Sequence, residues 1–287
     1  RVNLNVKREI IHVDSTARKD LTMNNTPFLY IKIDNFSTTT EHEVQHALQQ
    51  FKSNNQNKMT GLILDLRSNP GGLLEQAIKV ADLFITEGVI VKTRGHFQET
   101  TYADPTVGKT SYPIIVLINK ESASASEIVS GVLQDLDRAV VIGRPSYGKG
   151  LVQTVYKIDN DRSLKMTTAK YYIPSGRLIQ KDGYLPSKIL ADKSNIDTSF
   201  VTSGGRSVIG GGGIVPDYHI KLEKPGPILS ACYREGLFFT FVQNNKNYWD
   251  GMPTLDDKLI IIDKFEKFLK ETDIDIKMEG ESNYQDM

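Results

Sequence analysis

The chain has 287 residues, which is enough for a large catalytic core together with a smaller appended region. Lysine plus arginine and aspartate plus glutamate each total 35, so there is no net positive charge of the kind that attracts nucleic acid or an anionic membrane surface. The single cysteine, Cys232, excludes a disulfide within the chain, and no apolar run reaches the roughly 20 residues of a membrane span.

The first predicted element is a strand at residues 2–6, where Val2, Leu4 and Val6 alternate with polar residues. No candidate partner strand precedes it in the sequence. We therefore expect residues 1–25 to form an N-terminal segment that includes the last strand of a domain whose body is missing from this chain.

A second strand and a helix come next. Residues 28–33 (FLYIKI) predict the strand, residues 37–40 supply cap-type side chains, and residues 41–51 predict the helix. Residues 61–66 (GLILDL) form a continuous apolar run, which is typical of a strand buried on both faces of a largely parallel sheet.

The middle of the chain repeats one unit, which consists of a buried strand, a turn of small residues and a helix. The first copy has its strand at 61–66, its turn at 68–72 and apolar helix positions at Leu74, Ala77, Ile78, Ala81 and Ile85. The second copy has its strand at 114–118, its turn at 122–126 and its helix at 127–136. Strands that alternate with helices predict an α/β core.

The remaining predicted elements are strands and then helices. Residues 139–143 form a third apolar strand, and residues 151–158 pair with residues 164–173. The glycine-rich residues 203–213 predict a flexible loop. Beyond Pro225, two amphipathic helices are predicted at 228–242 and 255–270, and we interpret them as an appended helical region.

The second turn carries the first chemical signal. Residues 119–128 (NKESASASEI) join a buried strand to a helix and place small hydroxyl residues at the helix N-terminus. Free backbone N–H groups and the positive end of the helix dipole lie there, and both assist a nucleophile and an oxyanion. Serine is also an ordinary helix cap, so this segment by itself leaves both interpretations open.

Three other segments accompany it in order: residues 65–72 (DLRSNPGG), 148–153 (GKGLVQ) and 171–177 (YYIPSGR). Together the four segments resemble the carboxyl-terminal processing, or tail-specific, serine proteases, which share a DLR-x-NPGG turn, a SASASEI segment, a GKG-x-x-Q segment and a YY-x-PSGR-like run. The resemblance extends from about residue 28 to residue 220. Four motifs in one order are far more specific than any one of them.

In that family the nucleophile is the middle serine of SASAS, which is Ser124 here, and the general base is the lysine of GKG, which is Lys149. The resemblance, rather than any periodicity, selects Ser124 over Ser122 and Ser126. A serine hydroxyl needs a base to remove its proton, and a lysine serves as that base only when burial keeps it uncharged. The apolar residues that follow Lys149 are compatible with such a pocket.

The glutamine of the third motif maps to Gln153, which would hold the lysine amine in place without adding a charge. In a straight strand Lys149 and Gln153 share a face but lie about 13 Å apart at Cα. Their long side chains must therefore converge, or the segment must bend.

The resemblance also implies an oxyanion hole. It points to the backbone N–H of Ala125, directly after the nucleophile, and to that of a glycine in the NPGG turn, where we assign Gly72 with Gly71 as the alternative. Glycine at this place permits an unusual φ and lets a substrate carbonyl approach the backbone. Asp135 has a family counterpart as well, and we interpret its role as structural.

Residues 42–46 (HEVQH) match the HExxH pattern of zinc proteases. The apolar stripe of this helix runs through Val44, Ala47, Leu48 and Phe51, so His42 and His46 fall on the opposite face and are expected to point to solvent. No GxxH continuation follows, and no glutamate occurs between Glu43 and Glu75 to act as a third ligand. The sequence therefore does not favour a zinc enzyme, and no metal site is predicted.

The resemblance implies an α/β fold with a crotonase-like core sheet flanked by helices and an appended C-terminal helical region. We expect an N-terminal segment at 1–25, a serine–lysine protease core at 26–222 and the helical region at 223–287. Family members commonly carry a PDZ domain before the core, which captures a substrate's C-terminal carboxylate by adding the peptide as a strand. Only its last strand, around residues 2–6, is expected in this chain.

The implied activity is acyl transfer without a cofactor, on protein or peptide substrates recognised through their C-terminal region. Neither a nucleic-acid partner nor a transmembrane segment is expected, the terminal helices are candidates for joining copies of the chain, and the family implies a periplasmic or cell-envelope location. The alternative is a non-enzymatic ligand- or peptide-binding module on the same fold. The joint presence of Ser124, Lys149 and Gln153 favours the enzyme, because a binding module has no need of a neutral lysine beside a serine.

Overall fold

A computed structural model describes residues 13–56, 59–108, 110–181, 199–221, 225–246 and 257–272. The chain separates into two compact units, residues 1–221 and residues 222–287. The strand predicted at residues 2–6 lies outside the described residues.

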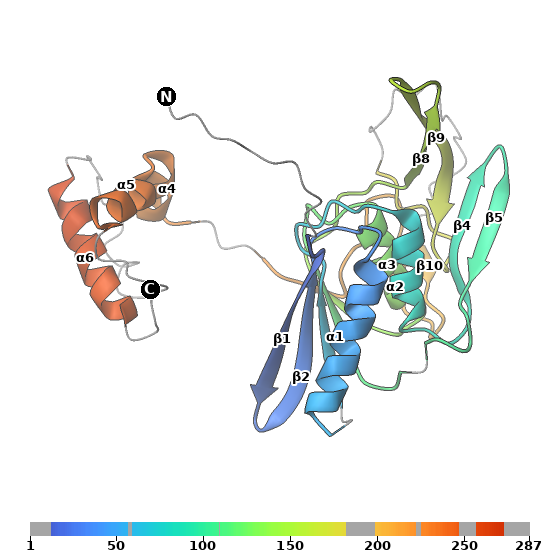
Figure 1. The fold of residues 1–287 in the computed structure, drawn as a ribbon, viewed down its shortest axis with the longest axis horizontal. Coiled ribbons are helices and arrows are strands. Elements are labelled where there is room, and N and C mark those ends of the chain that lie inside the picture. The colour runs from blue at the N-terminus through green and yellow to red at the C-terminus, as the bar shows by residue number, and fades with distance from the viewer. Residues whose placement is uncertain are drawn as a thin grey trace. The chain divides into compact units, whose positions relative to one another are not determined.

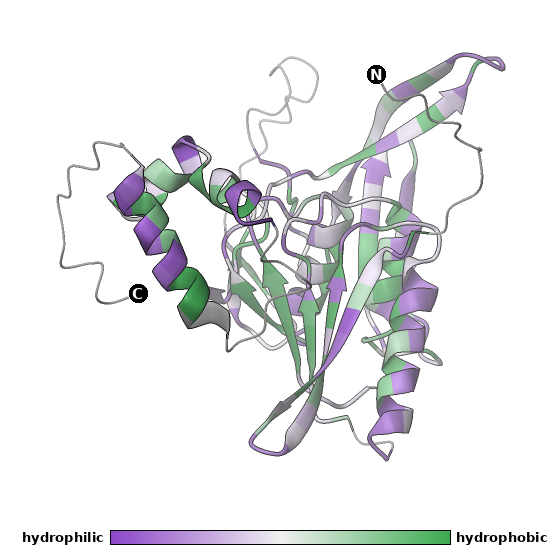
Figure 2. Ribbon diagram, turned by 60° about the vertical axis from the view of Figure 1, so that its left-hand side comes forward, coloured by the Kyte–Doolittle hydropathy of each residue, from purple (hydrophilic) through white to green (hydrophobic). Residues whose placement is uncertain are grey.

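The larger unit is built on a mostly parallel sheet with the strand order β1-β2-β3-β6-β7-β12 (Figure 1). Its strands are β1 (Thr16–Met23), β2 (Thr26–Ile33), β3 (Leu62–Asp65), β6 (Ile114–Ile118), β7 (Val140–Gly143) and β12 (Tyr218–His219). β1 and β2 pair antiparallel, and every other neighbouring pair is parallel. The predicted α/β core with a central sheet is confirmed, and Figure 2 shows its middle strands as hydrophobic.

Three helices belong to this sheet: α1 (Thr40–Asn54), α2 (Leu74–Asp82) and α3 (Ala125–Asp135). α1 connects β2 to β3, α2 follows β3, and α3 connects β6 to β7. Parallel strands present their carboxyl ends at one edge of a sheet. The segments that follow β3, β6 and β7 therefore begin at the same edge, and they contain the NPGG turn, the serine turn and Lys149.

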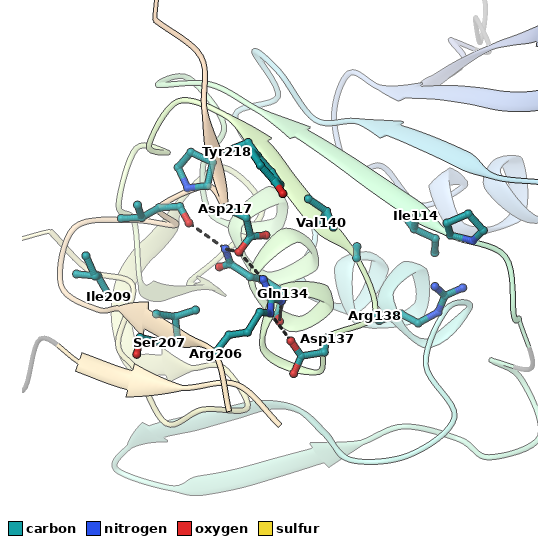
Figure 3. Close-up of a pocket in the computed structure, with 15 residues that line it drawn as sticks. Ile114, Gln134, Asp137, Arg138, Val140, Arg206, Ser207, Ile209, Asp217 and Tyr218 are labelled. Carbon is teal, nitrogen blue, oxygen red and sulfur yellow. Dashed lines mark hydrogen bonds and ion pairs between the residues drawn. The ribbon is translucent and has the colours of Figure 1, made fainter. Parts of the chain in front are cut away.

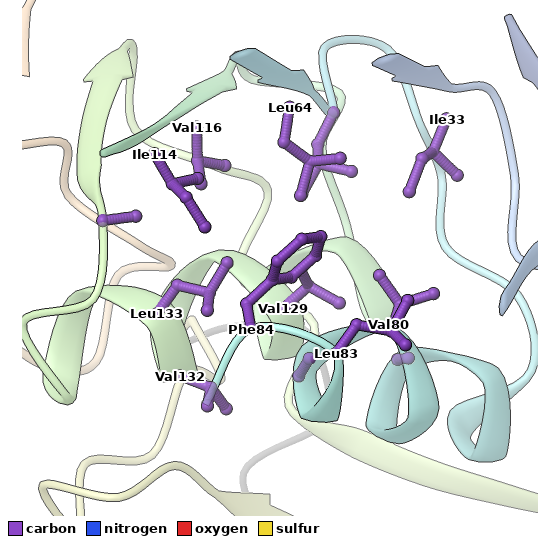
Figure 4. Close-up of a cluster of buried hydrophobic side chains, with 14 of the residues drawn as sticks. Ile33, Leu64, Val80, Leu83, Phe84, Ile114, Val116, Val129, Val132 and Leu133 are labelled. Atoms are coloured by element: carbon purple, nitrogen blue, oxygen red, sulfur yellow. The ribbon is translucent and has the colours of Figure 1, made fainter. Parts of the chain in front are cut away.

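Helix α3 is buried on all sides, and even its polar residues Glu127, Ser130, Gln134 and Asp135 have almost no exposed surface. One side packs against the main sheet, where side chains of β3 and β6 face those of α2 and α3 (Figure 4). A Cβ added at Gly131, on the same helix, would lie 2.7 Å from Ile173 and 2.8 Å from Ile214. A helix enclosed this way holds its N-terminal residues in fixed positions.

A second, antiparallel sheet has the strand order β5-β4-β9-β8. Its strands are β4 (Val89–Gly95), β5 (Gln98–Tyr102), β8 (Leu151–Lys157) and β9 (Ser163–Tyr172). The predicted β8–β9 pair is confirmed, and the hairpin extends away from the rest of its unit (Figure 1). Strands β1, β4 and β5 were missed: β1 and β5 are polar and mostly exposed, whereas β4 begins with the apolar residues Val89, Ile90 and Val91.

The glycine-rich residues 203–213 differ from the prediction of a flexible loop. They contain β11 (Ser207–Ile209), which pairs with β10 (Ser199–Val201). Backbone hydrogen bonds also join Ser203 N–H to the carbonyl of Asp135 and Gly211 N–H to that of Leu178. The prediction was wrong because the lack of side chains here permits close backbone contacts with the core.

The smaller unit contains α4 (Pro227–Arg234), α5 (Leu237–Asn244) and α6 (Asp257–Glu271). The single helix predicted at 228–242 is wrong, because the chain breaks at Gly236, whose φ of 66° is left-handed and suits glycine. Phenylalanine rings join α5 and α6: Phe238 stacks on Phe265, and Phe241 meets Phe265 edge-on. No helix among the described residues is both long and apolar enough to cross a membrane.

Candidate active site

The three serines of the SASAS segment differ sharply in their surroundings. Ser122 and Ser126 have no exposed surface, and their hydroxyls donate to the carbonyls of Leu66, at 2.8 Å, and Asn69, at 3.0 Å. Ser124 is half-buried and stands at the N-terminus of α3. The flanking hydroxyls therefore fix the turn, and the middle one is the hydroxyl placed to meet a substrate.

The backbone of Ser124 is strained. Its φ of 55° and ψ of −112° lie outside the regions that residues with a Cβ ordinarily occupy. Such conformations cost about 1–3 kcal/mol and recur at functional sites, including the sharp strand-to-helix turns that expose a nucleophilic serine. Strand β6, this turn and α3 form such a strand–turn–helix unit.

The NPGG turn after β3 is tied directly to the serine turn. Asn69 is fully buried, its amide donates to the carbonyl of Ile33, and its carbonyl accepts the N–H of Ala123 at 3.0 Å. A Cβ added at Gly71 would lie 2.8 Å from Ser124 Cβ and 3.1 Å from the Ala125 nitrogen. The glycine therefore allows the two turns to touch, as an oxyanion hole shared between them requires.

The two glycines of this turn differ in their hydrogen bonds. The N–H of Gly71 donates to the side-chain oxygen of Asn69 at 2.8 Å. Among the described residues, no hydrogen bond engages the N–H of Gly72 or that of Ala125. The two assigned residues, Gly72 and Ala125, therefore have N–H groups without a partner among the described residues, whereas Gly71 does not.

Lys149 is half-buried and lies just before β8. Leu151, two residues further on, is buried, and Val152 packs against the core. The N–H of Lys149 donates to Glu127 at 2.8 Å, and the same Glu127 oxygen accepts the N–H of Ser124 at 2.8 Å. The structure thus brings the backbones of the two predicted catalytic residues together, although no hydrogen bond among the described residues joins their side chains.

Gln153 lies on β8, where a register shift between Val152 and Gln153 bends the strand. For Gln153 to reach Lys149, either their side chains had to converge or the segment had to bend, and a bend of the strand is one of these two possibilities. The Gln153 side chain is nevertheless exposed, and no hydrogen bond among the described residues links it to Lys149. The structure therefore brings Lys149 to Ser124 but does not bring Gln153 into contact with either.

Tyr171 is a neighbour of the site to which the sequence analysis gave no role beyond its motif. Its hydroxyl donates to the carbonyl of Lys149. Complete burial and the nearby Glu127 carboxylate raise the pKa of Tyr171 well above its usual value. The phenol therefore stays protonated and able to donate.

Glu127 was also missed, and it is the only carboxylate that touches both catalytic segments among the described residues. Burial raises the pKa of its carboxyl, while hydrogen bonds from Ser146, Lys149, Gly148 and Ser124 act in the opposite direction. A sequence signal existed, because Ser124 and Glu127 have the S-x-x-E spacing of a helix capping box.

The remaining polar residues of the motifs hold the scaffold. Asp65 is buried and accepts hydrogen bonds from Arg67 and Tyr30, which overcome the effect of burial and lower the pKa of its carboxyl.

Asp135 forms an ion pair of 2.8 Å with Arg177, in which both side chains are almost completely buried. Asp135 is the last residue of α3 and Ser124 is its N-cap, which places them about 16 Å apart along the helix. This distance agrees with the structural role expected for Asp135.

The histidines of the HExxH match are exposed, as expected from the helix stripe. His42 and His46 stack with their rings 6.4 Å apart, and Glu43 instead accepts hydrogen bonds from Ser15 and Thr39. Among the described residues, no group of three or more potential ligands could hold a metal ion. This match therefore does not identify a metal centre.

A cavity of about 720 Å³ lies at the opposite end of α3 from Ser124 (Figure 3). Three of its charged side chains are paired, with Arg206 bound to Asp137 and Asp217 at 2.5 and 2.6 Å, and Arg138 donates to the carbonyls of Phe84 and Tyr112. Asp217 also accepts the N–H of Val141 and the amide of Gln134. The cavity contains none of the predicted catalytic residues and belongs to the structural end of the helix.

Residues 27–188 match the family described as Peptidase family S41. Two similar curated proteins are the carboxy-terminal-processing protease of Bartonella bacilliformis, 46% identical over 56% of this chain, and the carboxy-terminal processing protease CtpA of Bacillus subtilis, 36% identical over 64%. The aligned regions cover 38% and 39% of those proteins, so the chain spans less than half the length of either relative.

The fold resembles that of a solved protein with the name photosystem II D1 C-terminal processing protease. The TM-score is 0.54 at 23% identity, and the match covers 74% of this chain and 49% of the other. At this identity the likeness concerns the fold alone.

Proposed function

Because the chain belongs to peptidase family S41, we propose that it is a serine endopeptidase that cleaves near the C-terminus of protein substrates, with Ser124 as nucleophile and Lys149 as general base. The observation that carries this proposal is the contrast among the three serines. Two hydroxyls are bound inside the turn, and that of Ser124 is half-exposed on a strained backbone beside the Lys149 segment.

The chemistry is acyl transfer in two steps. Ser124 Oγ attacks the scissile carbonyl carbon while the neutral amine of Lys149 takes the hydroxyl proton. The C–N bond then breaks, and Lys149 delivers that proton to the leaving amine. Water attacks the resulting ester with Lys149 again as base, which releases the new C-terminal carboxylate and restores the serine. No cofactor takes part in these steps.

The negative charge on the carbonyl oxygen during attack needs hydrogen-bond donors. We assign this role to the N–H groups of Gly72 and Ala125, which have no other partner among the described residues. Each such donor contributes about 10²–10³-fold to turnover in comparable sites. Gln153 remains part of the proposal as the residue that holds the Lys149 amine, and this role requires its exposed side chain to turn inward when substrate binds.

Three further expectations belong to the same proposal. We propose that the core is crotonase-like, which its strand–turn–helix units support, and that the protein acts in the periplasm or cell envelope, which rests on family resemblance. Recognition of a substrate's C-terminus is proposed for the whole protein, in which an upstream PDZ domain would supply it.

The test is cleavage of an unstructured peptide of about 20 residues, with products identified by mass spectrometry. Ser124→Ala is expected to abolish cleavage and to leave the melting temperature close to that of the wild type. Ser130→Ala is the matched control, because Ser130 is a buried serine of the same helix whose hydroxyl bonds only to helix carbonyls. It should keep wild-type turnover.

Near-normal cleavage by Ser124→Ala would sink the assignment of the nucleophile. A wild-type chain that binds peptides but cleaves none would favour the non-enzymatic binding module instead.

A further inference from the structure

Glu127 stands at the third position of α3, and its side chain has no exposed surface. Four groups donate hydrogen bonds to its carboxylate. Oε1 accepts the Ser146 hydroxyl at 2.5 Å and the Gly148 N–H at 2.6 Å, and Oε2 accepts the N–H groups of Ser124 and Lys149, both at 2.8 Å. One buried carboxylate therefore connects the start of α3 with residues 146–149.

An ordinary capping box accounts for only one of these bonds. In that motif the glutamate at the third helical position accepts the N–H of the N-cap residue, here Ser124. The other three donors come from a segment about 20 residues later in the sequence. Helix capping does not require these three hydrogen bonds, so they indicate a second role for Glu127.

The geometry limits how far apart the two catalytic backbones can move. The nitrogens of Ser124 and Lys149 share one oxygen atom, so they cannot be separated by more than twice 2.8 Å. The carboxylate therefore fixes the backbone position of Lys149 relative to that of Ser124.

The four hydrogen-bond donors also indicate the protonation state of the Glu127 carboxyl group. Both oxygens receive two donors, and a proton on either would compete with them, so the bonds fit the ionised form. None of the four donors carries a formal charge. The Glu127 charge is thus stabilised by dipoles, which leaves the Lys149 amine uncommitted to an ion pair with it.

Ser146 extends this arrangement into the glycine-rich segment. Its hydroxyl accepts the N–H of Ile214 at 2.6 Å while donating to Glu127, and its own N–H donates to the Ile214 carbonyl at 3.0 Å. A Cβ added at Gly213 would lie 2.7 Å from the Ser146 oxygen. Residues 146–149 are consequently fixed on both sides.

We propose that Glu127 is a positioning residue that holds Ser124 and Lys149 in register for proton transfer. This inference rests on the proposed function, because it assigns a role within the same site. Misplacement of a catalytic group by about 1 Å can cost about 10²-fold in rate, so a loss of this size is expected when the carboxylate is replaced.

The test is Glu127→Gln in the 287-residue chain, with two measurements. The amide replaces one acceptor oxygen with a donor group, so the backbone amides of Ser124, Gly148 and Lys149 should exchange with deuterium about tenfold faster. In peptide cleavage, kcat should fall about 10²-fold with KM within about threefold of wild type. Because a loss of folded protein would also lower the apparent kcat at unchanged KM, the folded fraction of each variant is verified by circular dichroism.

The matched control is Asp217→Asn at the other end of α3. Asp217 also accepts a backbone N–H, that of Val141 at 2.7 Å, and a side-chain amide, that of Gln134 at 3.0 Å. This variant should speed exchange at Val141 and keep kcat within about threefold, because the two sites are separate.

Three outcomes would overturn the proposal. In Glu127→Gln, they are unchanged exchange at the three amides, or faster exchange there with a normal kcat. The third is an equal fall of kcat in the control variant Asp217→Asn. If Glu127→Gln does not fold, Ser146→Ala replaces it, with an expected loss of about fivefold in kcat at constant KM. Normal kcat in that variant would also overturn the proposal. A wild-type chain that cleaves nothing would overturn the proposed function and this catalytic role together, and the exchange result would then report only a structural contact.

Discussion

The two ends of α3 each hold a buried carboxylate, and they stabilise it in different ways. At the C-terminal end, Asp135 is paired with the guanidinium of Arg177, and the neighbouring Arg206 is paired with two aspartates. At the N-terminal end, Glu127 receives four neutral donors and no ion pair is formed among the described residues. At the C-terminal end, opposite charges are paired. At the N-terminal end, uncharged hydrogen-bond donors surround the carboxylate.

This difference separates a scaffold from a reactive site. Paired charges leave no group free for chemistry, and in the cavity at that end Arg206 is engaged with Asp137 and Asp217. At the other end, the Ser124 hydroxyl is half-exposed, Lys149 forms no ion pair with any described residue, and no hydrogen bond among these residues engages the N–H groups of Gly72 and Ala125. An acyl-transfer site requires fixed dipoles that hold its groups in place without neutralising them.

The largest effect should follow from replacing the base. Lys149→Arg is expected to lower kcat about 10⁴-fold, as much as Lys149→Ala, because a guanidinium stays protonated and cannot accept the Ser124 proton. Steady-state cleavage of the test peptide measures this, with circular dichroism to verify folding. Near-normal turnover in Lys149→Arg would mean that positive charge, and not proton acceptance, matters at this position, and the serine–lysine mechanism would have to be abandoned.

A change at the C-terminal end should affect stability instead. Removing one partner of a buried pair leaves an uncompensated charge, so Asp135→Asn is expected to lower the free energy of unfolding by about 3–5 kcal/mol. Below its melting transition the variant should keep kcat within about threefold of wild type. Denaturant unfolding and peptide cleavage measure the two quantities. A fully stable but inactive variant would contradict the comparison, because it would place catalysis at both ends of the helix.

Most of the scaffold could be predicted from the sequence. Apolar strands such as β3 and β6 are recognisable because both faces are buried, and the turns that follow them carry motif residues. Strand β5 was missed because its side chains are largely exposed and polar, so that pairing with β4 rather than composition makes it a strand. The break between α4 and α5 at Gly236 could not be predicted from the sequence, because it depends on the left-handed backbone of this glycine.

The site could be predicted in part. The motif selected Ser124 and Lys149, but no periodicity distinguishes Ser124 from Ser122 and Ser126, whose bonds to distant carbonyls exist only in the fold. Glu127 lies three residues from Ser124, yet three of its four donors come from residues 146–149. Contacts of this kind depend on the parallel arrangement of strands, which brings the ends of β6 and β7 to one edge.

The smallest expected effect is a difference in pH dependence between wild type and Glu127→Gln. Burial raises the pKa of Glu127, so its carboxyl takes up a proton at a higher pH than an ordinary glutamate does when the pH falls. Protonation adds an O–H where a donor is already bound, so wild-type kcat should decline by a few-fold on this acidic limb. Tyr171 faces Glu127 but stays neutral, because its own pKa is also raised.

Stability should change in the opposite direction across the same pH window. A carboxyl whose pKa is higher in the folded than in the unfolded state adds stability below the unfolded pKa, and this contribution is lost as the pH rises through the folded pKa. Wild type should therefore lose stability relative to Glu127→Gln as the pH rises through that interval, while its kcat rises. Both profiles are measured for both proteins, because their difference isolates Glu127 from every other titrating group. If the kcat ratio of the two proteins were constant with pH while the stability difference changed, Glu127 would titrate without affecting Ser124 and Lys149, and the N-terminal end of α3 would hold its carboxylate for structural reasons alone.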